Sequence, residues 1–119
     1  MRRDSTNSFA RGIEQFNNRQ FFESHESWEE VWLRASEPDK TFLQGIIQVA
    51  AALHHCSLGN RAGAESLMRA GLDKLEEFPE DYRGLRLEAL RAALQEWLAG
   101  LADGRSPVGL PPPRIQLVG

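Results

Sequence analysis

Residues 42–55 read FLQGIIQVAAALHH, and their pattern is the strongest indication of the fold. Apolar side chains would cover more than half the circumference of a helix with this sequence, and no other stretch of the chain is as apolar. A helix that is apolar on so many sides is normally surrounded by other helices. We therefore predict that a helix over about residues 38–58 lies at the centre of an all-α fold.

The segments on either side also carry helical spacing. Phe9, Ile13 and Phe16 follow one another at steps of four and three, which places them on one face of a helix over about residues 5–15. The same reasoning predicts helices over about residues 20–35, 61–77 and 83–102. Gly59 is expected to end the central helix, and Asn60 to cap the next. Convincing strand alternation is absent, so the sequence predicts a compact bundle of about five helices, arranged as helical hairpins.

The composition changes abruptly after residue 104, where the chain continues as RSPVGLPPPRIQLVG. Three consecutive prolines exclude a helix there. One interpretation is a disordered terminus. The other, which we favour, is a strap across a groove, because the segment is rich in large apolar residues. These are Val108, Leu110, Ile115, Leu117 and Val118. The chain would then consist of a single helical domain, residues 1–104, with a proline-rich tail, residues 105–119, packed on it.

Length and composition exclude several classes of protein. A chain of 119 residues with 41% hydrophobic and 26% charged residues fits one globular domain. The single cysteine, Cys56, excludes a disulfide scaffold and favours a reducing compartment, so we expect a cytoplasmic protein. The net charge of -3 argues against a nucleic-acid partner. Neither a membrane-spanning run nor the apolar stretch of a signal peptide is present, so we expect no membrane partner.

The informative residues are polar groups that interrupt apolar faces. In the second predicted helix, His25 lies on one stripe with Trp28 and Trp32, and Glu29 lies one helical turn further on. Glu26 lies on the adjacent stripe. Both tryptophans fit either the core or the wall of a ligand pocket, and their indole N–H groups need partners, for which Glu29 or Gln44 could serve.

A second polar row interrupts the central helix. It consists of Gln44, Gln48 and His55, with Gly45 and Ala52 beside it. Small residues at these positions would let a neighbouring helix approach closely.

Two interpretations of these polar residues compete. In the first, which we favour, they form a buried hydrogen-bond network that fixes how the helices pack, because burying such groups unpaired costs about 1–3 kcal/mol each. In the second, they form a site for a divalent metal or for acid–base chemistry. The candidates for that site are His25, Glu26, Glu29, Gln44, Gln48 and His55, and those for the metal are His25, Glu29 and His55.

Known metal motifs do not match. The string HESWE, residues 25–29, begins like a zinc-protease helix, but Glu29 stands where the second histidine is needed. The Glu-x-x-His spacing of di-iron bundles is absent at all three histidines. We therefore predict no cofactor, and a divalent metal is required only by the second interpretation.

Three strings together resemble a known family. They are FFESHESWEEVWL from residue 21, FLQGIIQVAAALHH from residue 42 and GNRAGA from residue 59. In this order they resemble the prokaryotic family called domain of unknown function 309, over roughly residues 10–78. The resemblance implies a compact all-α fold in which the His-Glu-x-x-Glu string faces the Gln-x-x-x-Gln row. It implies no activity, because none is assigned to that family.

Three hypotheses about function follow. The first is a non-enzymatic helical interaction module with a structural polar cluster, for which a second copy is a candidate partner. The second is a metal-dependent or acid–base enzyme, similar to a hydrolase, that uses His25 and Glu29 with help from Glu26 and His55. The third is a small-ligand pocket lined by Trp28 and Trp32.

Overall fold

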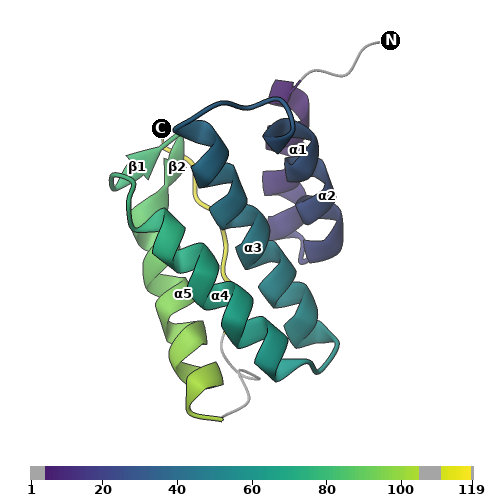
Figure 1. The fold of residues 1–119 in the computed structure, drawn as a ribbon, viewed down its shortest axis with the longest axis vertical. Coiled ribbons are helices and arrows are strands. Elements are labelled where there is room, and N and C mark those ends of the chain that lie inside the picture. Colours follow the sequence, from purple (N-terminus) through teal and green to yellow (C-terminus); the bar gives the residue numbers. More distant parts are fainter. Residues whose placement is uncertain (1–4, 105–110, 119) are drawn as a thin grey trace.

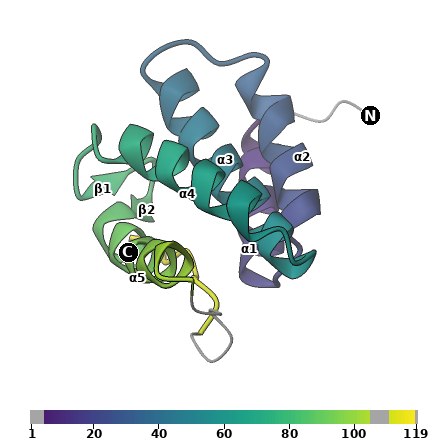
Figure 2. The same cartoon turned by 60° about the horizontal axis from the view of Figure 1, so that its bottom comes forward.

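The chain folds as a row of helices (Figure 1). The structure, a computed structural model, describes residues 5–104 and 111–118. Its elements are α1 (Ser5–Asn17), α2 (Phe21–Trp32), α3 (Asp39–Ser57), α4 (Arg61–Leu75), β1 (Asp81–Tyr82), β2 (Leu85–Arg86) and α5 (Leu87–Ala102). Each helix packs against the next along the chain, and α5 lies apart from α2, on the other side of α4 (Figure 2). The predicted all-α fold with five helices is confirmed for the described residues.

Helix α3 is central, as predicted, because it packs against α2 on one flank and against α4 on the other. The contact with α4 brings the two backbones together at Gly45 and Gly71. A Cβ atom on Gly71 would lie 2.7 Å from the carbonyl oxygen of Gly45, and one on Gly45 would lie 3.0 Å from Leu75. Gly45, one of the small residues beside the polar row, therefore permits a close approach of α4 to α3, as predicted. Within the described residues, no helix combines the length and apolarity needed to cross a membrane.

The contact between α1 and α2 is just as close. Trp28 has no exposed surface, and its Nε1 donates a hydrogen bond to the carbonyl oxygen of Phe9 at 3.2 Å. The indole ring lies directly against Gly12, where any Cβ atom would overlap it. The indole N–H of Trp28 thus has a backbone acceptor in α1. The partners that the sequence suggested, Glu29 and Gln44, do not serve this role for Trp28.

The breaks between helices follow local chemistry. Gly59 adopts a positive φ of 79°, and the Oδ1 atom of Asn60 accepts a hydrogen bond from the N–H of Gly63 at 3.1 Å. Both roles were predicted. At the start of α3, the carboxylate of Glu37 accepts hydrogen bonds from the backbone N–H and the hydroxyl of Thr41, at 2.9 and 2.7 Å.

The predicted start of the fifth helix at about residue 83 is wrong, because residues 81–86 form an antiparallel hairpin and the helix begins at Leu87. The two residues at the turn, Arg83 and Gly84, both have positive φ values, 50° and 80°. This is the backbone that a tight two-residue hairpin turn requires. Strands of two residues are too short to show alternation, so the sequence pattern did not reveal them.

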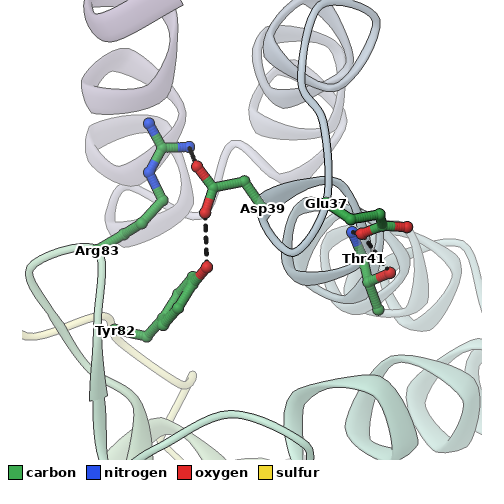
Figure 3. Close-up of polar contacts among 5 residues, drawn as sticks. All are labelled: Glu37, Asp39, Thr41, Tyr82 and Arg83. Carbon is green, nitrogen blue, oxygen red and sulfur yellow. Dashed lines mark hydrogen bonds and ion pairs between the residues drawn. The ribbon is translucent and has the colours of Figure 1, made fainter.

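The hairpin is fastened to the start of α3 by Asp39 (Figure 3). Tyr82 donates its hydroxyl proton to Asp39 Oδ1 at 2.6 Å, and the guanidinium of Arg83 lies 3.8 Å from Asp39 Oδ2. The same guanidinium sits over the ring of Phe9, 4.4 Å from its centroid. A carboxylate in the first turn of a helix also interacts favourably with the helix dipole. We call Asp39, Tyr82 and Arg83 the clasp. Through these contacts it joins α1, α3 and the hairpin.

The described part of the tail, residues 111–118, lies against α1, β2 and α5. Ile115 is buried, and Leu117 forms a bridge with Leu85. Residues 1–4, 105–110 and 119 lie outside the described residues, and these include Val108 and Leu110 of the predicted strap. The division into a domain and a strap over residues 105–119 thus stays a prediction.

Replacing Gly12 with alanine tests the contact between α1 and α2. The added methyl group must displace the buried indole, so Gly12→Ala should lower the free energy of unfolding by about 1–3 kcal/mol. Gly100→Ala in α5 is the matched control, because the place of its Cβ is empty. Alanine there should stabilise by up to about 1 kcal/mol through helix propensity. Urea unfolding measures both, and equal stability of the two variants would contradict the packing described.

Alkaline pH tests the clasp. Burial, together with the hydrogen bond and charge of Asp39, raises the pKa of Tyr82 to about 12. Because the folded pKa lies above the unfolded value of about 10, the Tyr82 contribution is present below pH 10 and is lost as the pH rises from about 10 to about 12. Over this interval the wild-type chain should lose more stability than Tyr82→Phe, which has no proton to release. Unfolding curves of the two proteins that change in parallel would disprove this.

Candidate functional site

His25 and Glu29, which the sequence predicts to lie one helical turn apart, are in contact in the structure. His25 and Glu29 lie one turn apart on α2, with 3.5 Å between His25 Nδ1 and Glu29 Oε1. That distance is too long for a good hydrogen bond, and Nδ1 has no other hydrogen-bond partner within the described residues. The Glu29 side chain is 51% exposed, so water screens the pair. The contact is that of a partly solvated pair on a helix surface.

Glu26 belongs to a different face. It lines a polar groove of about 270 Å³ between α1 and α2. The other residues along this groove are Arg11, Gln15, Glu23, Ser27 and Glu30. Ser27 Oγ donates to Gln15 Oε1 at 2.7 Å, and Ser8 Oγ donates to Glu30 Oε2 at 2.8 Å. These bonds hold α1 and α2 together, and Glu26 lies on this side of α2.

The row on α3 does not form the predicted network with His25. Gln44 is exposed, and the buried Oε1 of Gln48 has no hydrogen-bond partner in the described part of the chain. His55 Nδ1 lies 3.0 Å from Asn60 Nδ2. Because Asn60 uses its Oδ1 to cap α4, its Nδ2 must donate, and Nδ1 of His55 accepts. His55 therefore supports a helix cap.

The two tryptophans have separate environments. Trp28 is a core residue without exposed surface. Trp32 is half-buried, with Lys40 Nζ 4.2 Å from its ring centroid, and Lys40 also donates to the Trp32 carbonyl at 3.2 Å. Nε1 of Trp32 has no hydrogen-bond partner among the described residues. The indoles therefore do not form one shared pocket wall.

Metal-ligating and nucleophilic groups are also dispersed. Across residues 5–104 and 111–118, no three His, Cys, Asp or Glu side chains come together as a metal site requires. Burial raises the pKa of the Cys56 thiol, and the charge of Arg61 opposes that effect only in part. A protonated thiol is a poor nucleophile, so Cys56 is not activated for attack.

Sequence reasoning missed Phe22 and His54. Phe22 is 48% exposed, yet its ring centroid lies 6.3 Å from that of His25, which stacks on it, and 5.3 Å from that of His54 on α3. Leu58, one turn beyond His54, is 66% exposed. We call Phe22, His25 and His54 the Phe22 patch. The sequence signal for this contact was weak, because Phe22 is simply an apolar residue on α2. Its contact with His54 depends on how α2 and α3 align.

Two comparisons place the chain among known proteins. Residues 9–67 match the family described as "Domain of unknown function (DUF309)". A protein of Aquifex aeolicus (strain VF5), named "Uncharacterized protein", is 34% identical over 98 residues. The matched part is 82% of this chain but only 28% of that protein, so the chain spans little more than a quarter of its relative. The resemblance drawn from the three strings is therefore confirmed: from α1 into α4, this chain carries the domain of unknown function 309.

Proposed function

We propose that this chain is a non-enzymatic helical interaction module, that the Phe22 patch is its contact surface, and that its partner is a second copy. The observation that carries the proposal is the environment of Phe22. A large apolar ring on the surface is held between two imidazoles from two different helices while about half of it stays in contact with water. Aromatic residues, phenylalanine among them, are enriched at the core of protein interfaces.

The polar groups of the patch favour self-association. The Glu29 carboxylate, which is half-exposed, lies 3.5 Å from His25 Nδ1, so an acceptor accompanies the two imidazoles. A two-fold interface places the same surface of each copy face to face. Because imidazoles can donate and a carboxylate accepts, this surface can pair with a second copy of itself.

The environments of the other candidates also support an interaction module. His55 supports the cap of α4, and Trp28 donates to the backbone of α1. In the Aquifex aeolicus relative, the segment similar to this chain accompanies much further sequence, as modules often do. The enzyme alternative rests on the contact between His25 and Glu29 alone. The pocket alternative would have to use Trp32 without Trp28, which is fully covered.

A charge placed in the patch tests the proposal. The patch is far smaller than the roughly 800 Å² per partner of a stable dimer, so we expect weak, reversible self-association in the micromolar-to-millimolar range. Sedimentation velocity should show dimer formation by the wild-type chain and none by Phe22→Glu. Leu33→Glu is the control, because Leu33 is 70% exposed at the other end of α2. A monomeric wild-type chain, or equal disruption by the control, would contradict the proposal.

His25→Ala separates the structural role of His25 from a metal-binding role. The imidazole is partly exposed, and its contacts are the long one with Glu29 and the exposed ring of Phe22, so the variant should lose no more than about 1 kcal/mol of stability. Elemental analysis of untagged protein should find no stoichiometric metal in either form, and a chelator should leave the melting temperature unchanged. Stoichiometric metal in the wild-type chain that is lost in the variant would support the enzyme alternative instead.

A further inference from the structure

The described part of the tail lies between the end of α1, the hairpin and α5. Residues 111–118 run back along α5 towards the hairpin, in an extended conformation (Figure 1). We call the residues that hold the segment, Asn17, Gly84, Arg86 and Trp97, the tail cleft.

The polar contacts in the tail cleft all go to the main chain of the bound segment. The Asn17 side chain accepts from the Ile115 N–H at 2.8 Å and donates to the Ile115 carbonyl at 3.0 Å. The Arg86 N–H donates to the Gln116 carbonyl, and the Val118 N–H donates to the Gly84 carbonyl, both at 2.8 Å.

Two further contacts follow the same rule. Trp97 Nε1 donates to the Pro111 carbonyl at 3.1 Å, and Arg86 Nε donates to the Leu117 carbonyl at 3.4 Å. An extended segment that hydrogen-bonds to the edge of a hairpin is a recognised mode of peptide recognition.

Among the side chains of the segment, Ile115 is the main anchor that holds it in place. Ile115 is only 4% exposed and belongs to the hydrophobic core, and Pro113 is also buried. Arg114 and Gln116 alternate with them and are exposed. Leu117 is 58% exposed. The cleft therefore recognises an extended backbone with an isoleucine two residues after a proline, and it leaves the intervening residues open.

We infer that the tail cleft is a peptide-binding site, and that its external ligand is an extended segment of another polypeptide with a proline two residues before an isoleucine anchor. The chain's own residues 111–118 are the resident competitor. Because the contacts use the main chain and one anchor, a foreign segment of this pattern makes the same bonds. The resident segment has one advantage, which is its covalent connection to the rest of the chain, because linking two binding partners raises the effective concentration of one at the other. This inference is independent of the Phe22 patch.

Binding of a labelled peptide to full-length variants tests the inference. The probe is a fluorescent peptide with the sequence PPPRIQLV, which corresponds to residues 111–118. Ile115→Asp in the full chain removes the competing anchor, so fluorescence anisotropy should show binding at least about tenfold tighter than to the wild-type chain. Leu117→Asp is the matched control, because it adds the same charge at an exposed position of the tail. It should bind the peptide no better than the wild-type chain.

Two further changes show whether binding uses the cleft as described. A peptide with alanine in place of isoleucine should lose binding, and adding Asn17→Ala to the Ile115→Asp chain should weaken it at least about tenfold. Circular dichroism establishes that each variant is folded, and Ile115→Ala replaces the aspartate variant if that one is not.

Three results would overturn the inference. The first is a folded Ile115 variant that binds the peptide no better than the wild-type chain, and the second is equal binding of the alanine peptide. The third is a wild-type dimer that the free peptide dissociates and that Phe22→Glu leaves intact, because it would assign the cleft to the tail of a second copy instead.

Discussion

The close approach of α3 and α4 at Gly45 and Gly71 governs where the other helices can pack. A side chain at Gly71 would collide with the backbone of α3, and one at Gly45 would press against Leu75. With α4 fixed on one flank, α2 packs on the other and aligns Phe22 with His54. The start of α3 then places Asp39 where it can hold the hairpin through Tyr82. The central helix thus positions both the surface patch and the frame of the tail cleft.

Periodicity and capping chemistry predicted most of the fold, because both are local. The five helices, the central place of α3 and the Asn60 cap all follow from residues within a few positions of one another. The hairpin over residues 81–86 was missed because its strands are two residues long. The polar contacts were predicted less well, since they depend on which residues of neighbouring helices lie opposite each other. Phe22 therefore meets His54, and Trp28 finds a backbone acceptor in α1.

The two proposed binding surfaces belong to different parts of the chain. The Phe22 patch lies wholly within residues 9–67, the part that matches the family. The tail cleft combines Asn17, from that part, with Arg86, Trp97 and the bound segment, which lie beyond it. The first surface is thus a feature of the family segment, and the second is specific to the hairpin, α5 and tail that follow it. Neither surface requires chemistry at His25.

We propose that the chain acts by contact through the Phe22 patch. Backbone amide chemical shifts, recorded by NMR while the wild-type chain is diluted from millimolar to micromolar concentration, test this most directly. We expect concentration-dependent shifts around Phe22 and His54, with the amides around Leu33 unchanged. Shifts that are independent of concentration, or that map to another face of the molecule, would contradict it.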